Sequence, residues 1–403
     1  MTAVLSYFTQ MLRFTTAGES HGKALVSILE GAPAGLPILA TDINADLARR
    51  QQGYGRGRRM QIEQDQAEII SGVRAGFTIG SPIAMLIRNR DWDNWVDVMD
   101  PAPTEADSAG PRRREVTRPR PGHADLAGML KYGHQDARNI LERASARETT
   151  ARVAAGAICR KLLGEIGITI GSHIVELGGI AANVTDLPED INESADRSQL
   201  RTLDPDAEEQ WIALIDKTKK EGDTLGGVCE VVCRGVPVGL GSHVSWDRKL
   251  DGRIAGAMMS IHAVKGVGIG EGFDAAKVPG SQLHDEIHGG VERRRSGNIH
   301  RKTNRAGGLE GGMTTGEPVV VRVAMKPIST LMRPLATIDM KTGEAASASV
   351  ERSDVTAVPA MGVIAEAMLA FVIAHAVLEK FGSDSMNELK RNLEGYLDQV
   401  SRS

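Results

Sequence analysis

Residues 31–36, Gly-Ala-Pro-Ala-Gly-Leu, return as residues 235–240, Gly-Val-Pro-Val-Gly-Leu. Each copy follows an apolar segment that predicts a β-strand, residues 24–29 in the first case and residues 228–233 in the second. A single match could arise by chance, because Gly and Pro recur at turns in most folds. The order of further matches therefore decides whether the chain is internally duplicated.

Two more pairs keep the same order. Residues 76–82, Gly-Phe-Thr-Ile-Gly-Ser-Pro, return as residues 312–318, Gly-Met-Thr-Thr-Gly-Glu-Pro. The dipeptide Glu-Arg at residues 142–143 precedes an Ala-rich segment, and the same dipeptide at residues 351–352 precedes a second one. Three matches in one order predict two structurally similar halves.

Strand patterns typical of antiparallel sheets, with one long Ala-rich helix in each half, predict an α+β fold in which helices pack between or against sheets. If a pseudo-two-fold axis relates the halves, Arg143 and Arg352 are equivalent, and an anionic ligand between the halves can meet both. The expected boundaries are one domain over residues 11–382, halves at about 11–165 and 225–382, a polar and acidic linker at about 171–223, and tails at 1–10 and 383–403.

Composition places the protein among cytoplasmic globular proteins. The 403 residues are 41% hydrophobic, which is ample for a core, and the net charge of −4 argues against a general polyanion binder. Three cysteines are too few for a disulfide framework, and no spacing typical of metal ligands occurs. The N-terminus lacks a basic region followed by an apolar run, so export is not expected. The apolar stretch 355–378 contains Glu366 and His375, which favours a buried helix over a membrane span.

The segment 117–158 carries the features of an anion site. Ser145-Ala-Arg-Glu148 predicts a capping box at the start of the first Ala-rich helix. The remaining amides of that turn and the neighbouring arginines would attract an anion, such as the phosphate of a ligand.

Two histidines lie in sharply turning, glycine-rich motifs, which are His21 in Gly-Glu-Ser-His-Gly and His123 in Arg-Pro-Gly-His-Ala-Asp. Glycine lets a backbone approach a ligand closely, and imidazole exchanges protons near neutral pH. A lone Gly-His more often caps a turn, but two such motifs beside arginines or small polar residues favour a functional role. The other eight histidines are expected to be structural or to lie on the surface.

Arginines crowd two segments and suit a small ligand with several negative charges. The clusters are Arg49, Arg50, Arg56, Arg58 and Arg59 in the first segment and Arg118 and Arg120 in the second. Residues 112–114 and 293–295 are expected to be solvated charge. Nucleic-acid binding is disfavoured, because aromatic residues make up only 3% of the chain and no stacking platform is visible.

Two shorter signals are ambiguous when taken alone. Residues 326–330, Lys-Pro-Ile-Ser-Thr, follow an expected strand at 319–325 and could form a ligand loop. Asp354, at the entrance of the second Ala-rich helix, could cap that helix or relay a proton.

Longer motifs carry a resemblance to the chorismate synthase family, which extends from about residue 11 to residue 381. The motifs are GESHGKAL at 18–25, RPGHAD at 120–125, ERASARETTARVAAGAI at 142–158, TNRAGGLEGGMTTG at 303–316, MKPIST at 325–330 and RSDVTAVPA at 352–360.

The resemblance implies a lyase of the shikimate pathway that eliminates phosphate from 5-enolpyruvylshikimate 3-phosphate to give chorismate. It also implies a requirement for reduced FMN without net redox change, a β-α-β sandwich fold and a homotetramer. No flavin-reductase domain is recognisable, so an external flavin reductase is the expected partner. Nucleic-acid and membrane partners are not expected.

Residue roles follow from the matching motifs. The resemblance implies that His21 protonates the departing phosphate, that His123 protonates the reduced flavin, and that Asp354 accepts a proton from it. Arg50 and Arg56 match arginines assigned to the substrate phosphate or to NADPH. The implied FMN contacts are Arg143, Ala144, Ser145, His262, Ala263, Gly311, Lys326, Pro327, Ile328, Ser329, Thr330 and Arg352. Related enzymes often carry Asn or Gln at the position of His262, so the contact expected there is through the backbone.

Two alternatives remain open from the residues themselves. The arginines could grip the 2′-phosphate of NADPH in a flavin-dependent oxidoreductase, and the basic loops could bind RNA. Formation of chorismate without a nicotinamide would separate the first alternative from the lyase, and salt-dependent retention of RNA would favour the second.

Overall fold

The computed structural model describes residues 12–56, 64–103, 114–293, 295–351 and 354–402. Strands that alternate buried and exposed side chains form two larger antiparallel sheets. The first has the order β1-β2-β6-β3. Its strands are β1 (Arg13–Ala17), β2 (Ala24–Glu30), β6 (Ile83–Arg88) and β3 (Ala67–Ile69).

The second sheet has the order β10-β15-β9-β7-β8, and its neighbouring strands are also antiparallel. Its strands are β10 (Val264–Ile269), β15 (Val319–Met325), β9 (Gly227–Arg234), β7 (Thr169–Leu177) and β8 (Ile180–Ala181). The strands expected at 24–29, 228–233 and 319–325 are therefore confirmed to within one residue at each end.

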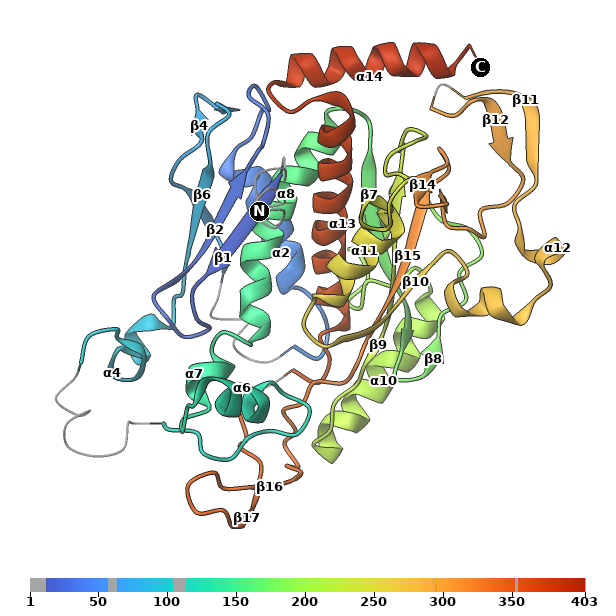
Figure 1. Ribbon diagram of the computed structural model, residues 1–403. Helices are drawn as coiled ribbons and strands as arrows, with labels where there is room; N and C mark the ends of the chain where they lie inside the picture. The colour runs from blue at the N-terminus through green and yellow to red at the C-terminus, as the bar shows by residue number, and fades with distance from the viewer. Residues whose placement is uncertain (1–11, 57–63, 104–113, 294, 352–353, 403) are drawn as a thin grey trace.

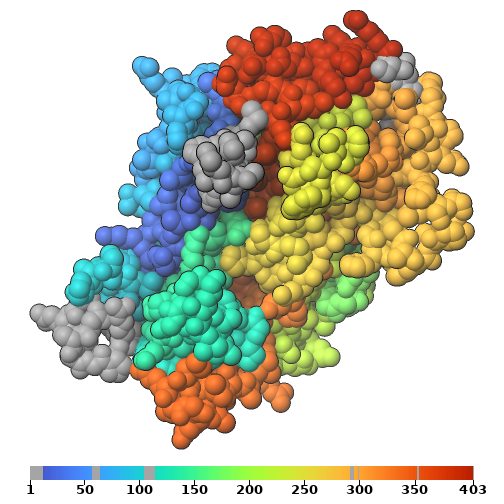
Figure 2. All heavy atoms as spheres, viewed as in Figure 1, coloured from blue at the N-terminus to red at the C-terminus, as the bar shows by residue number. Residues whose placement is uncertain are grey.

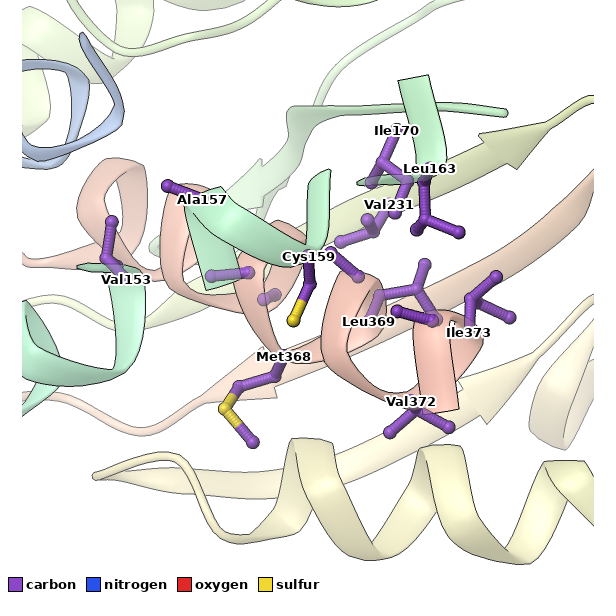
Figure 3. Packing of buried hydrophobic residues seen from close by; sticks show 14 of the residues in the cluster. Val153, Ala157, Cys159, Leu163, Ile170, Val231, Met368, Leu369, Val372 and Ile373 are labelled. Carbon is purple, nitrogen blue, oxygen red and sulfur yellow. The ribbon is translucent and has the colours of Figure 1, made fainter. Parts of the chain in front are cut away.

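Helices lie between the two sheets in Figure 1. Helix α8 (Thr149–Gly164) packs on β1 and β2, helix α13 (Val358–Phe381) packs on β7 and β9, and the two helices pack on each other. Figure 3 shows side chains of both helices interleaved with Ile170 of β7 and Val231 of β9. A mixed fold of sheets packed on Ala-rich helices is what the sequence predicts.

Helix α13 is buried, as its sequence predicts. Among the described residues it is the one helix with the length and apolar composition to cross a membrane, but 89% of its most apolar window is buried inside the protein. Gly156 of α8 brings the two central helices close together. A Cβ added there would lie 2.4 Å from the Ala367 Cβ of α13.

The repeated turns have matching hydrogen bonds. Thr78 Oγ1 donates to Pro33 O at 2.5 Å and accepts from the Leu36 amide at 2.9 Å. In the second copy, one threonine again joins the turn to a short hairpin. Thr314 Oγ1 donates to Pro237 O at 2.6 Å and accepts from the Leu240 amide at 2.8 Å.

Each of these threonines ends a two-residue hairpin. The hairpins are β4 (Val73–Arg74) with β5 (Phe77–Thr78), and β13 (Leu309–Glu310) with β14 (Met313–Thr314). Both central residues of each turn have positive φ, at 50° and 80° in the first and at 58° and 84° in the second. Such turns fit the twist of antiparallel strands and favour Gly, yet the first one begins with Ala75.

The expected linker differs from the structure at its start. Residues 169–177 form β7, a buried strand of the second sheet. The polar residues Ser172 and His173 gave no strand signal in the sequence. Both are buried, on opposite faces, where Ser172 Oγ bonds to Glu366 and His173 Nε2 bonds to Glu230. The rest of the segment contains two helices, α9 (Ile191–Ala195) and α10 (Pro205–Glu221).

The expected C-terminal tail contains an amphipathic helix, α14 (Met386–Val400), which covers one end of the molecule in Figures 1 and 2. It reaches both repeated turns. The Met386 amide donates to Ala34 O at 2.9 Å, and Tyr396 Oη donates to Val238 O at 3.1 Å.

Helix α2 (Ala40–Gln51) carries Arg49 and Arg50 of the first arginine cluster, and its N-cap is the apolar residue Leu39. Asp42 instead accepts from the Leu39 amide at 2.8 Å. The remaining elements include α11 (Leu250–Met259) and several peripheral pieces. These are α4 (Val96–Met99), α6 (Asp125–Tyr132), α7 (Arg138–Leu141), α12 (Gly280–Leu283), β11 (Ile287–Arg293), β12 (Gly297–Arg301), β16 (Ala336–Ile338), β17 (Ala345–Ser347) and the 3₁₀ turns η1 (Trp92–Asn94), η2 (Ala146–Glu148), η3 (Trp246–Arg248) and η4 (Gly272–Lys277).

A buried ion network joins α2, α8 and α13. The Glu366 carboxylate is fully buried and accepts from Arg49 at 2.9 Å through both oxygens. Arg160 and Arg201 contact the same carboxylate at 2.9 and 3.0 Å. These cations hold the pKa of Glu366 at about 2 although burial alone would raise it.

Candidate active site

The site lies at the entrance of α8, where the turn η2 leads into the helix. Ser145 caps this turn by accepting from the Arg147 amide at 3.3 Å. The predicted capping box is only half formed, because the Glu148 carboxylate does not return to the Ser145 amide. It accepts instead from Thr16 at 2.6 Å and Arg152 at 2.8 Å.

Arginine side chains from different elements converge on this entrance. Arg50 of α2 donates to Thr149 Oγ1 at 2.9 and 3.0 Å and to Ala146 O at 2.8 Å. Arg147 donates to Asn89 Oδ1 at 2.9 and 3.0 Å and also contacts Asp65. Asp65 is buried and also lies 3.7 Å from Arg50, so one carboxylate is shared by both cations.

Arg50 carries the electrostatic signature of the cluster. Burial, followed by the charges of Arg56 and Arg147, lowers the pKa of Arg50 to about 9, although Asp65 opposes the shift. Its second terminal nitrogen is buried and has no hydrogen-bond partner among the described residues. An anion at this point would supply the missing acceptor.

Arg56 and Asp354 pair across the two halves. Arg56 Nε lies 3.0 Å from Asp354 Oδ2, and both side chains are mostly buried. Asp354 is thus tied to an arginine, and the structure does not place it as the N-cap of α13, which is Ala357. Arg352, Arg58 and Arg59 lie outside the described residues.

His21 is held by Glu142 and by an aromatic ring. Its Nδ1 lies 2.9 and 3.0 Å from the two Glu142 oxygens, and its ring stacks on Trp95 with centroids 3.7 Å apart. Burial would raise the pKa of Glu142, but hydrogen bonds and charge from His21, with Arg138, lower it overall. Glu142 is therefore a carboxylate at neutral pH.

His123 has a similar carboxylate partner. Its Nδ1 lies 2.5 Å from Asp125, which is fully buried and also accepts from Arg120 Nε at 2.8 Å. Burial would raise the pKa of Asp125, but His123 and Arg120 together lower it well below its usual range. Both predicted acids are thus imidazoles tied to buried carboxylates.

The loop at Lys326–Thr330 meets the His123 segment. Arg120 donates to Thr330 Oγ1 at 2.8 Å, and Lys326 Nζ donates to Gly122 O. The Lys326 amide also donates to Ala263 O at 3.0 Å, where Ala263 has a φ of 65°. The loop at 326–330, which was ambiguous in the sequence, is therefore joined to one of the histidine motifs.

His262 faces the entrance of α8, with its Nδ1 3.8 Å from Glu148. Burial lowers the pKa of His262, Glu148 opposes this, and the charges of Arg152, His123 and Arg143 add to the decrease. Its Nδ1 is buried without a hydrogen-bond partner among the described residues. The ring is therefore a neutral group whose position suits a ligand hydrogen bond.

The sequence predicts that Arg143 binds an anion directly, but in the structure its guanidinium also bonds to the backbone. Its guanidinium donates to Thr16 O at 2.8 Å and Gly18 O at 3.1 Å, and its side chain remains partly exposed. Ala144 precedes the Ser145 cap, and Ser145 Oγ donates to Ser20 Oγ at 3.1 Å. These residues lie together with His21 at the entrance of α8.

Gly311 is not brought to this site within one chain. It begins the turn between β13 and β14, whereas Lys326 follows the other end of β15. Seven strand residues span about 20 Å, so the two lie at opposite ends of the sheet.

Sequence reasoning missed the partners of the histidines. Asp125 had a local signal, because it follows His123 by two residues in the same motif. Glu142 and Trp95 lie 121 and 74 residues from His21, and no spacing connects them to it. Arg295, expected to be solvated, is half-buried and donates to Ile166 O at 2.6 Å.

Comparison with known proteins gives one consistent result. A family model described as "Chorismate synthase" matches residues 12–378. A chorismate synthase of Geobacter metallireducens is 57% identical over 394 residues, covering 97% of this chain and 99% of the relative. One from Bacillus cytotoxicus is 54% identical over 385 residues, covering 95% and 98%.

A solved structure entitled "Crystal Structure of Chorismate Synthase" superimposes with a TM-score of 0.77 at 46% identity, covering 97% of this chain and 99% of that chain. The family match spans both halves and every predicted site residue. The chain therefore belongs to the chorismate synthase family, whose members are lyases.

Proposed function

We propose that this chain eliminates phosphate from 5-enolpyruvylshikimate 3-phosphate to form chorismate, with reduced FMN bound in the site. The observation that carries the proposal is the pairing of two imidazoles with an arginine cluster at one helix entrance. His21 and His123 each have a buried carboxylate partner, and Arg50 has a buried nitrogen without an acceptor. Cations to hold a phosphate and acids to protonate it are what this elimination requires.

Arg50 and Arg56 are the proposed ligands of the substrate phosphate. Their charges disfavour each other when no anion is present, which is one cause of the lowered pKa of Arg50. A phosphate between them would relieve that repulsion. The same groups could hold the 2′-phosphate of NADPH, so their charge alone does not choose between the two ligands.

His21 is the proposed acid for the leaving phosphate. Because Nδ1 is bonded to Glu142, proton exchange with a ligand is assigned to Nε2. His123, with Nδ1 on Asp125, would likewise protonate the flavin through Nε2. Asp354, held by Arg56, is the proposed acceptor of the proton that returns.

The residues present fit a bound flavin. His262 offers a buried ring nitrogen without a hydrogen-bond partner among the described residues, and the loop Lys326 to Thr330 lies beside the His123 segment, to which Lys326 and Thr330 are bonded. The proposed FMN contacts are Arg143 to Ser145, His262, Ala263, Gly311, Lys326 to Thr330, and Arg352. When bound, reduced FMN would supply transient electron density that eases the loss of phosphate.

Gly311 supports the proposed homotetramer. Strand β15, about 20 Å long, separates its end of the sheet from Lys326, so we propose that its turn reaches a flavin at the entrance of α8 from a second copy of the chain. We also propose that the layered sheets form the β-α-β sandwich of the family, with two pseudo-symmetric halves. Matching strand orders and the shared bonds of Thr78 and Thr314 support this relation.

The remaining proposals concern the cellular setting. A cytoplasmic location is supported by three buried free cysteines and by the burial of α13. An external flavin reductase is proposed as the source of reduced FMN.

The test is anaerobic turnover with photoreduced FMN and no nicotinamide. The wild-type chain should release phosphate and form chorismate, whereas His21→Ala and His123→Ala should bind FMN and lose most turnover. His284→Ala, an exposed histidine away from the site, is the matched control. Wild-type rates in both site variants would refute the assigned roles, and a requirement for NADPH would favour the oxidoreductase.

A further inference from the structure

The Glu142 side chain is almost completely buried, at 1% exposure, at the end of α7. One oxygen accepts from both the backbone amide and Nδ1 of His21, each at 2.9 Å. The other lies 3.0 Å from Nδ1 and accepts from Arg138 at 2.8 Å. The carboxylate therefore binds the backbone and the ring of one residue at the same time.

Stacking also fixes the plane of the His21 imidazole. Trp95 stacks on the ring at an interplanar angle of 22°, and its indole nitrogen donates to Asp91 at 3.0 Å. The Arg138 guanidinium lies 5.2 Å from the centre of the Trp95 ring, so it contacts both Glu142 and Trp95. Rotation of the His21 ring would break the carboxylate bonds and the stack together.

The rest of the electrostatic environment consists of charged groups on nearby elements. Arg114 lies 4.3 Å from the Trp95 ring centre, Glu351 bonds to Arg138 at 3.1 Å, and Glu19 and Lys23 flank His21 in its own loop. Glu142 is the carboxylate in direct contact with the imidazole. Its effect on the ring is therefore the one that a single substitution can isolate.

We propose that Glu142 is a positioning residue that holds the His21 ring in place and selects its tautomer with hydrogen on Nδ1. The inference rests on the proposed role of His21. Glu142 touches no reacting atom in this scheme, because its oxygens are occupied by His21 and Arg138. Its contribution passes through the imidazole, as in other sites where a buried carboxylate orients a catalytic histidine.

A second trio in the same chain provides the matched control. His173, Glu230 and Arg322 repeat the arrangement on the second sheet, with distances of 3.3 and 2.8 Å to the carboxylate. His173 is buried at 1% exposure, and none of the three is a proposed site residue. Glu230→Gln therefore removes a similar charge without touching the proposed chemistry.

The experiment compares Glu142→Gln with Glu230→Gln. Steady-state rates with reduced FMN are measured anaerobically from pH 5.5 to 9, together with FMN affinity and thermal stability. Glu142→Gln should lower kcat roughly 10²- to 10⁴-fold and change KM by less than about threefold. FMN affinity and the melting temperature should stay close to those of the wild type, because Glu142 acts on the orientation of the His21 ring.

Two outcomes would overturn the inference. One is a wild-type kcat in Glu142→Gln. The other is a loss that matches that of Glu230→Gln and comes with weaker FMN binding or a lower melting temperature, which would indicate a structural role only. The inference and the proposed function fail separately, because an active His21→Ala would contradict the function, whereas an inactive His21→Ala with an active Glu142→Gln would contradict only the inference.

Discussion

Thr78 and Thr314, 236 residues apart, each donate to the carbonyl of a turn proline and accept from the amide three residues after it. Both hydroxyls are buried. The pair shows that the same hydrogen bonds close the turn in both copies of the repeated sequence.

Replacing either hydroxyl should therefore have a similar cost. Thr78→Val and Thr314→Val keep the side-chain shape but leave a buried amide and carbonyl unsatisfied, which costs about 1–3 kcal/mol each. Denaturant unfolding measures the change, with the exposed Thr185→Val as control. A loss in only one of the two variants would show that the turns are not energetically equivalent.

The close contact of α8 with α13 makes a second prediction. Gly156→Ala would place its Cβ 2.4 Å from the Ala367 Cβ and 2.6 Å from its Cα, so the helices must separate. The expected loss is about 1–3 kcal/mol or more.

Gly256→Ala is the control for this change. Gly256 lies within α11 with nothing within 4 Å of an added Cβ, so alanine should stabilise the helix by about 0.5–1 kcal/mol. Equal effects of the two substitutions on the melting temperature would contradict the packing argument.

Glu366 should make the protein sensitive to acid. Its pKa is lowered from 4.5 to about 2 by Arg49, Arg160 and Arg201, so it stabilises the folded state above pH 4.5. That contribution, about 3 kcal/mol, is lost as the pH falls from 4.5 towards 2. Unfolding free energies measured across this range should show the slope in the wild type.

Glu366→Gln should lower the free energy of unfolding by about 3–5 kcal/mol at pH 7, because the three arginines lose the carboxylate that they share. Its remaining stability should depend less on pH below 4.5 than that of the wild type. An unchanged slope would show that other carboxylates dominate acid unfolding.

Arg50 should make the chain respond to inorganic phosphate. Its second terminal nitrogen has no hydrogen bond among the described residues and lies 3.7 Å from Asp65, so an anion there would offset part of the cost of keeping a buried cation, and phosphate should raise the melting temperature. Because the pKa of Arg50 is about 9, this protection should weaken as the pH rises through 9. Arg50→Gln should lose it, whereas Arg13→Gln, which removes an exposed ion pair, should keep it. Full protection of Arg50→Gln would place the anion elsewhere.

The sequence predicts what is decided locally. The repeated turns depend on Gly at positive φ and on a proline carbonyl, and both are visible as letters. The strand at 227–234 follows from the alternation of Cys229, Val231 and Cys233 towards the core, where all three are buried.

The elements and contacts that were not predicted are of two kinds. Some depend on residues distant in the sequence, and one had a local sequence signal that was not used. β7 has buried polar residues that only Glu366 and Glu230 explain, and these lie 194 and 57 residues away. Helix α14 did carry a local signal. Ser385 is its N-cap and accepts from the Glu388 amide, and its apolar face is formed by Leu389, Leu393 and Leu397. In the site, the histidines could be found from their motifs, but Glu142 could not, because only the fold brings it to His21.

Two consecutive residues of α2 have different functions, one in stability and one in the proposed ligand binding. Arg49 holds Glu366 in the ion network, and Arg50 bonds to Ala146 O at the proposed anion site. A helix cannot turn one of these side chains without turning the other, so the rotation of α2 is set once for both. A substitution that rotates α2 to strengthen ligand binding at Arg50 would therefore also move Arg49 in the Glu366 network. At this helix, ligand affinity and folding stability change together.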